Sequence, residues 1–155
     1  MRLYNLHHSE STVASKLQSV QNAAARLITC SRKYDHITPI LKELHWFPIS
    51  ERIKFKIMLL TFKALHQQSP AYIQDLVAYY QPSRILRSSH LLLLNPTNFH
   101  LKTYGSRAFA VSAPELWNSL PVSIRSCNNL SSFKSNLRSF WRIVQRLDQA
   151  WIGAI

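Results

Sequence analysis

Glycine is almost absent from this chain, which has two glycines and seven prolines among its 155 residues. Two-residue hairpin turns need residues that adopt a positive φ, and glycine does so at the lowest steric cost. A fold that depends on many tight hairpins is therefore disfavoured. The composition instead favours helices joined by segments of proline, serine and asparagine.

The first predicted helix runs from Glu10 to about Ser31. Its apolar residues recur at intervals of 4, 3, 4, 3 and 1, which is the spacing of a stripe along one helix face. The stripe consists of Val13, Leu17, Val20, Ala24, Leu27 and Ile28.

Five further helices are predicted from serine or threonine start signals and neighbouring prolines. They cover residues 39–45, 51–67, 71–80, 113–120 and 132–149, and the expected N-cap residues are Thr38, Ser50, Ser69, Ser112 and Ser131. Pro48 is expected to separate the second and third helices. Trp46 and Phe47, which precede it, are expected to be packing residues. Trp117 is expected to fill the core, and base stacking by an exposed ring is the alternative interpretation.

The pattern changes after Arg84. Short apolar runs at 91–94, 99–103 and 107–111 are separated by Asn95-Pro96 and Gly105-Ser106. They predict a small extended or β-hairpin-like insert around residues 90–111. The expected fold class is mainly α: a compact multi-helix domain over residues 13–149, preceded by a polar lead-in (1–12) and followed by a tail (150–155).

The charge balance is strongly basic, with 19 Lys and Arg against 7 Asp and Glu, a formal net charge of +12. Residues 1–80 hold ten basic and five acidic side chains, and residues 81–155 hold nine and two. The excess is thus spread along the chain. Such a protein attracts polyanions, so nucleic acid is the first candidate partner and anionic membrane the second.

The two cysteines, Cys30 and Cys127, fit neither a disulfide framework nor a zinc knuckle. We therefore expect a reduced intracellular environment, either nucleus or cytoplasm. The uncharged run Ser88–Leu101 is too short and too polar to span a bilayer, so no transmembrane segment is expected.

The last predicted helix has the clearest functional pattern, because its basic residues are spaced four apart and lie on one ridge: Lys134, Arg138, Arg142 and Arg146. Apolar residues occupy a separate arc. The ridge is either a solvated face or a surface for phosphates, and against the +12 background the two interpretations carry equal weight. Calmodulin-like or membrane-surface binding would use the same pattern.

A second basic group, Arg52, Lys56 and Lys63, falls within a narrow arc of the predicted helix 51–67. It is either the solvated face of a core helix or a second surface for phosphates. The core side of that helix is expected to carry Ile53, Ile57, Leu60 and Ala64. Four arginines at predicted non-helical or edge positions are further candidates for phosphate contact: Arg84, Arg87, Arg107 and Arg125.

Signals for catalysis are missing from the sequence. The seven acidic residues are scattered, with no pair suited to two-metal chemistry, and there is no glycine-rich phosphate loop. The seven histidines form no H-x-x-x-H pair and have no cysteine at ligand spacing. No catalytic residue, metal, cofactor or small-molecule substrate is therefore predicted.

Six stretches in order resemble one family: LQSVQNAAARLI (17–28), DHITPILKELHWFPISERIKFKI (35–57), FKALHQQSPAYIQDL (62–76), YQPSRILRSS (80–89), GSRAFAVSAPELWNSLPVSIR (105–125) and FKSNLRSF (133–140). Together they are similar to the C-terminal region of LINE-type (non-LTR) retrotransposon reverse transcriptases, downstream of the palm and thumb. The resemblance covers about residues 13–141.

The resemblance implies a fragment without enzymatic activity, because the family's RNA-directed DNA polymerase needs two adjacent aspartates that this sequence lacks. The endonuclease residues of the family are also missing. Two functions are then expected: sequence-independent binding of the RNA or DNA backbone through the basic helix faces, or an orphaned packing element of the parent polymerase with no ligand of its own. In the second case its former partner is the missing palm and thumb, and Trp46, Phe47, Phe133 and Trp141 should be exposed.

Overall fold

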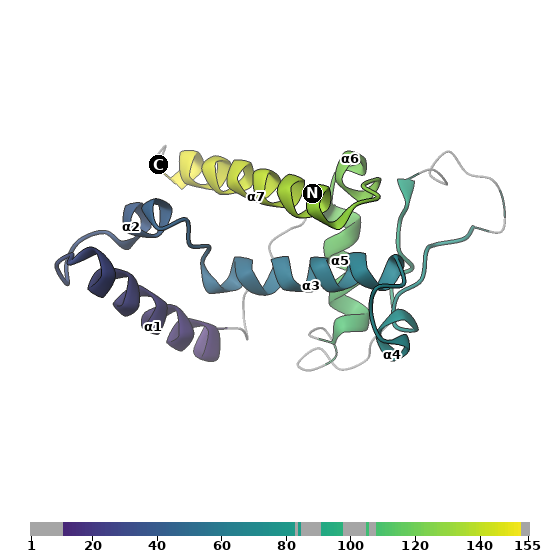
Figure 1. Cartoon of the computed structure of the whole chain (residues 1–155), viewed down its shortest axis with the longest axis horizontal. Coiled ribbons are helices and arrows are strands. Elements are labelled where there is room, and N and C mark those ends of the chain that lie inside the picture. The colour runs from purple at the N-terminus through teal and green to yellow at the C-terminus, as the bar shows by residue number, and fades with distance from the viewer. Residues whose placement is uncertain (1–10, 83, 85–90, 98–104, 106–107, 153–155) are drawn as a thin grey trace. The chain divides into compact units, whose positions relative to one another are not determined.

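The computed structural model describes residues 11–82, 84, 91–97, 105 and 108–152, of which residues 11, 12 and 144–152 are described by their backbone alone (Figure 1). Most of the described residues are helical, which confirms the predicted mainly α class. The helices are α1 (Ser11–Thr29), α2 (Ile37–Glu43), α3 (Ile49–Leu65), α4 (Ala71–Gln74), α5 (Phe109–Ser119), α6 (Val122–Arg125) and α7 (Leu130–Ile152).

Helices α3 and α7 begin earlier than predicted because other groups satisfy their first N–H groups. The N–H of Ile49 donates to Oε1 of Gln18 at 2.8 Å, so α3 starts at Ile49 and Ser50 is not its cap. At α7, Oδ1 of Asn129 accepts the N–H of Ser131 at 2.9 Å, so Asn129 provides the cap expected from Ser131.

The predicted start of α5 was wrong by a few residues. Phe109–Val111, expected to be extended, form its first turn, and Pro114 lies inside the helix. The hydroxyl of Ser112 does not cap α5 but bonds back to the carbonyl of Ala108 at 3.1 Å. Pro114 has no N–H to donate to the carbonyl of Ala110, which is a local weakness in an otherwise regular helix.

Helix α4 ends at Gln74, six residues before its predicted end, because the chain turns to an extended course. Tyr79 and Leu94 form an isolated antiparallel bridge, with Tyr80 N–H bonded to Leu93 O at 2.8 Å and Asn95 N–H to Ala78 O at 3.0 Å. Residues 90, 98–104 and 106–107 of the predicted insert lie outside the described residues.

The side-chain amide of Asn118 on α5 hydrogen-bonds to the backbone of Leu94 on the side opposite the bridge to Tyr79. Its Oδ1 accepts the N–H of Leu94 at 2.8 Å, and its Nδ2 donates to the carbonyl of Leu94 at 3.0 Å. Leu94 itself is 1% exposed. One amide therefore provides both of the hydrogen bonds that a neighbouring strand would provide to this residue.

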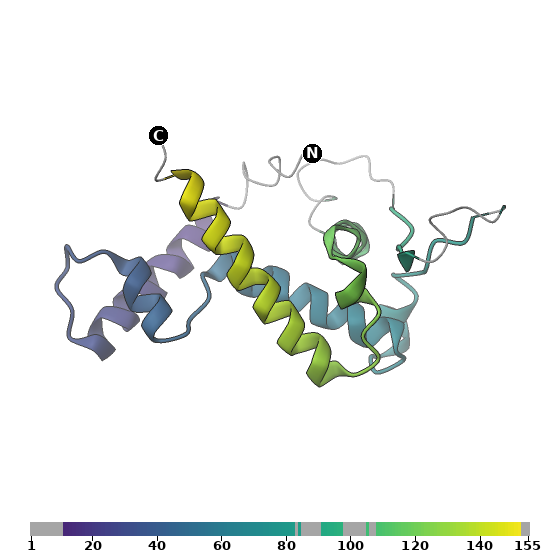
Figure 2. The same cartoon turned by 90° about the horizontal axis from the view of Figure 1, so that it is seen from above.

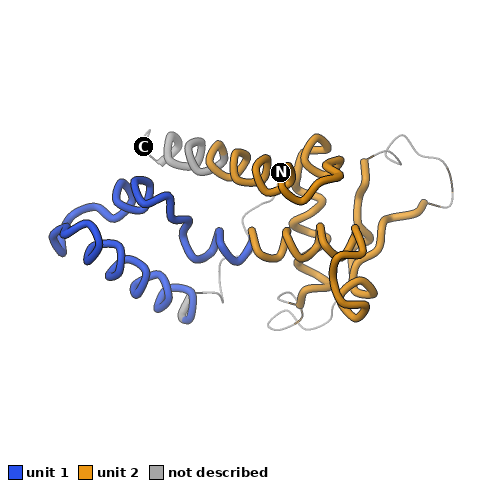
Figure 3. Tube along the Cα trace, in the orientation of Figure 1, with its two compact units in different colours: residues 1–54 blue, residues 55–155 orange. Residues whose placement is uncertain are grey.

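The contacts divide the chain into two units, residues 1–54 and residues 55–155 (Figure 3). The boundary falls within α3, between Lys54 and Phe55. The single domain expected over residues 13–149 stays a prediction.

In unit 1, helices α1 and α2 enclose a small apolar core made by Ala25, Ile40 and Leu41, with Ile37, Leu44 and Trp46 packed against it. Trp46 is thus a packing residue, as predicted. The carbonyl of Phe47 accepts a hydrogen bond from Nε2 of Gln21 at 2.9 Å, which ties the segment before α3 to α1.

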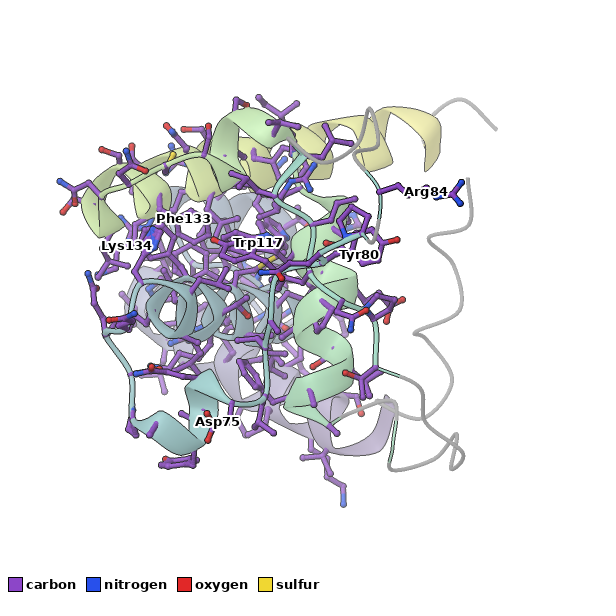
Figure 4. All side chains as sticks on the ribbon, turned by 90° about the vertical axis from the view of Figure 1, so that its right-hand side faces the viewer. Asp75, Tyr80, Arg84, Trp117, Phe133 and Lys134 are labelled. Carbon is purple, nitrogen blue, oxygen red and sulfur yellow. The ribbon has the colours of Figure 1, made fainter. Side chains whose placement is uncertain are left out.

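In unit 2, the core is centred on three aromatic rings from three helices. The ring of Phe133 on α7 stacks on Phe62 of α3 at 4.5 Å and on Trp117 of α5 at 5.8 Å between centroids. All three side chains are fully buried, and Nε1 of Trp117 donates to the carbonyl of Leu92 at 3.0 Å. Trp117 therefore fills the core as predicted, and Figure 4 shows it beside Phe133 among the packed side chains.

Three helices end at a residue in the left-handed conformation that is not glycine: Cys30 (φ 52°), His45 (φ 55°) and Gln67 (φ 57°). At the end of α3 the N–H of Gln68 bonds to Lys63 O at 2.7 Å and that of Gln67 to Ala64 O at 3.2 Å, which is the Schellman pattern. A side chain at this backbone position is sterically unfavourable.

We predict that Gln67→Gly raises the free energy of unfolding by about 0.5–1 kcal/mol, because relief of the left-handed strain outweighs the cost of the greater conformational entropy that glycine gives the unfolded chain. Urea denaturation followed by circular dichroism measures the change. Gln68→Gly, one residue further and without a positive φ, is the matched control and should be neutral or slightly destabilising. Equal effects of the two variants would contradict the strain argument.

Candidate nucleic-acid interface

Helix α7 presents its predicted basic ridge beside the row of residues that enters the core. Arg138 and Arg142 are exposed and Lys134 is half-buried, whereas Phe133, Leu137 and Trp141 are buried. Because the buried residues fix the rotation of the helix about its axis, the ridge has to lie at or beyond the edge of the core. Arg146 belongs to α7, but its side chain lies outside the described part.

Helix α3 also carries its lysines away from the core. Lys56 is exposed and Lys63 half-buried, while Met58, Thr61 and Phe62 are buried. The core side predicted for this helix was partly wrong. Ala64 is buried as expected, but Ile57 and Leu60 are only half-buried and Ile53 is 43% exposed.

Arg52, the third member of the α3 group, is exposed and belongs to unit 1. It lies on the same helix as Lys56, four residues before it, but in the segment on the other side of the unit boundary. It is therefore left out of the surface described below.

Two contacts bring α3 and α7 together within unit 2. The guanidinium of Arg138 lies 5.9 Å from the ring centroid of Phe55, a cation–π contact, and Phe133 stacks on Phe62. The earlier residue of α3 thus meets the later residue of α7, so the two helices run antiparallel, as Figures 1 and 2 also show.

This arrangement brings the lysines of α3 to the same levels along the helix axes as the ridge of α7. Lys56 directly follows Phe55, whose ring contacts Arg138. Lys56 and Arg138 therefore lie at the same level along the two helices. By the same argument, Lys63 lies at the level of Lys134. We call the following five residues the basic surface of unit 2: Lys56, Lys63, Lys134, Arg138 and Arg142.

Few negative charges are available to neutralise the basic surface. Residues 55–65 of α3 and 130–143 of α7 contain no Asp or Glu. Within the residues that the structure describes, the one ion pair joins Lys54 to Glu51 at 3.2 Å, outside this surface. The cations of the basic surface are thus open to an external anion, and exposed ones interact with it without a large desolvation cost.

Arg125 was wrongly expected to be an edge residue for phosphate contact. It lies in α6, is only 7% exposed, and its Nε and Nη1 have no hydrogen-bond partner. Burial lowers the pKa of its guanidinium. By contrast, Arg84 is exposed and extends away from the packed side chains (Figure 4), while Arg87 and Arg107 lie outside the described residues.

Other kinds of site find no support in the described part of the chain. No group of three or more His, Cys, Asp or Glu residues is arranged there to hold a metal ion. No described helix combines the length and apolar character needed to cross a membrane.

Sequence reasoning missed the contact between Phe55 and Arg138, which joins the two basic helices. Phe55 stands between Lys54 and Lys56, and this alternation is visible in the sequence. The partner of its ring is 83 residues away, so only the packing of α3 against α7 identifies it.

A comparison of the chain with protein-family models, curated proteins and solved structures finds no match.

We predict that Arg125→Met raises the free energy of unfolding by about 1 kcal/mol, because an apolar side chain of similar length removes a buried charge with unpartnered donors. Thermal and urea denaturation measure the change. Arg84→Met, at an exposed position, is the control and should change stability by less than about 0.5 kcal/mol. A clear loss of stability in Arg125→Met would show that the guanidinium has a partner in solution.

Proposed function

We propose that the chain is a non-catalytic, intracellular C-terminal fragment of a LINE-type reverse transcriptase that binds the RNA or DNA backbone without sequence preference. The observation that carries the binding proposal is the antiparallel pairing of α3 and α7, which brings together the cations of two helix segments, 55–65 and 130–143, that contain no Asp or Glu. The resemblance of residues 13–141 supports the family origin.

The spacing of the ridge on α7 suits a backbone ligand. Successive members are four residues apart, which corresponds to about 6 Å along the helix axis. Lys134, Arg138 and Arg142 can therefore contact several phosphates of one strand instead of a single anion. Release of the condensed counterions from those phosphates would supply the free energy of binding.

The burial of the aromatic residues near the basic surface supports binding without sequence preference. Binding to bases without a groove-reading element relies on exposed rings for stacking. Trp117, Phe133 and Trp141 are buried, and Phe55 is half-buried under Arg138. The described part of unit 2 thus offers charge to the phosphates and no ring of the basic surface to the bases.

The double variant Arg138→Gln/Arg142→Gln tests this function. We expect it to weaken binding of a fluorescein-labelled oligouridine about tenfold or more at low salt, measured by fluorescence anisotropy. The slope of log K against log salt should become shallower by about 1.4, since each lost contact to a single strand contributes about 0.7.

Arg32→Gln/Lys33→Gln is the matched control, because it removes two exposed basic residues outside the basic surface. It changes the net charge by the same amount and should have a clearly smaller effect on the slope. If both double variants act equally, binding depends only on net charge. If the wild-type affinity does not change with salt, the phosphate-contact proposal is wrong.

A second function, a packing element without a ligand of its own, is favoured by a different observation. The residues expected to be exposed in that case are not: Trp46 and Phe47 are half-buried, and Phe133 and Trp141 are buried. However, most of the apolar stripe of α1 is exposed. A flat salt dependence together with a requirement for this stripe in protein binding would favour the packing function.

A further inference from the structure

Helix α1 has its apolar stripe on the outside. Val13 is 71% exposed, Val20 67% and Leu27 81%, and Leu17 and Ile28 are also exposed. An amphipathic helix normally turns such a stripe toward the core of its own domain. The apolar stripe of α1 is instead an unoccupied face in unit 1.

Hydrogen bonds of two glutamines explain this orientation. Gln21, which is 7% exposed, donates to the carbonyl of Phe47, and Gln18 accepts the N–H of Ile49. Ala25, on the same side of α1, is fully buried in the core with Ile40 and Leu41. Rotating the stripe inward would break both hydrogen bonds, which tie α1 to the segment before and at the start of α3.

The stripe has the spacing of a helix-pairing surface. From Val13 to Leu27 its members alternate at intervals of four and three, which is the a/d pattern that packs against a second helix. The side chains are of small and medium size, and Ala23 and Ala24 allow close approach. We propose that the stripe binds an amphipathic helix of a partner protein that carries acidic residues beside its apolar face.

Charge identifies the partner as acidic. Helix α1 contains Lys16 and Arg26 and no acidic residue, and residues 11–54 hold seven basic against three acidic side chains. A second copy of the chain would bring the same excess of positive charge to the interface, which opposes pairing. The stripe also lacks the Trp and Tyr residues that favour the surface of a bilayer. This proposal is independent of nucleic-acid binding by the basic surface.

The test uses the full chain and a synthetic helical probe with Leu at a and d and Glu at e and g, labelled for fluorescence anisotropy. The same peptide with Lys in place of Glu, and a scrambled acidic peptide without the heptad spacing, are the probe controls. We expect the acidic heptad probe to bind at least about tenfold more tightly than either control. Leu17→Gln/Val20→Gln/Leu27→Gln should weaken its binding at least tenfold.

Two further variants locate the binding surface. Tyr72→Gln/Ile143→Gln removes apolar side chains that are 69% and 56% exposed outside α1, and it should bind the probe like the wild type. Arg138→Gln/Arg142→Gln should keep most of the probe affinity while losing oligouridine binding. This pair of results separates docking on α1 from general attraction of an acidic peptide to a basic protein.

Five outcomes would overturn the proposal. The first two are probe binding that survives the α1 substitutions, and a Lys probe that binds as tightly as the Glu probe. A third is a dimer in sedimentation equilibrium that the α1 substitutions dissociate, which would make a second copy the occupant. A fourth is binding of vesicles with 30% phosphatidylserine to the wild type and not to the α1 variant, which would identify a membrane. A lowered melting temperature of the α1 variant would show that the chain itself covers the stripe.

Discussion

The stacked rings of Phe62, Phe133 and Trp117 determine how the helices of unit 2 are arranged, because each ring comes from a different helix. Packing these large, fully buried side chains leaves little freedom in the rotation of α3 or α7 about its axis. The outward position of Lys56, Arg138 and Arg142 follows from that packing. The candidate interface is thus a consequence of the core, and replacing one of the three rings would disturb the basic surface without touching a cation.

Unit 1 depends on a different kind of constraint, since polar groups hold α1. The apolar periodicity of Val13 to Leu27 predicts the helix correctly, but it does not reveal which way the helix faces. The hydrogen bonds of Gln18 and Gln21 decide the orientation, and their partners lie 31 and 26 residues away. Single-sequence reasoning has no access to such pairings, and glutamine in a helix is ordinarily a solvent-facing residue.

Local signals explain the other successes and errors. Trp117 and Trp46 could be placed in cores from their neighbours, and α7 could be found from its spacing, because short-range patterns carry that information. The sequence predicts Ser131 as the cap of α7, but Asn129 provides it, and it predicts Ser112 as the cap of α5, but that hydroxyl bonds back to Ala108. Serine, asparagine and threonine all suit several roles near a helix start, and only the backbone geometry separates them. The spacing of the basic residues alone predicts the ridge on α7. Only the contact between Arg138 and Phe55 shows that the ridge lies next to α3.

The amide of Asn118 has one more consequence. The bridge to Tyr79 uses the groups of Leu93 and Asn95 on one edge of the segment, and Asn118 uses both groups of Leu94 on the opposite edge. At Leu94 neither edge is open to a strand from another molecule. Exposed strand edges are common starting points for aggregation, and natural proteins block them in various ways. A single side chain of α5 protects this extended segment from edge-to-edge association at its most buried residue.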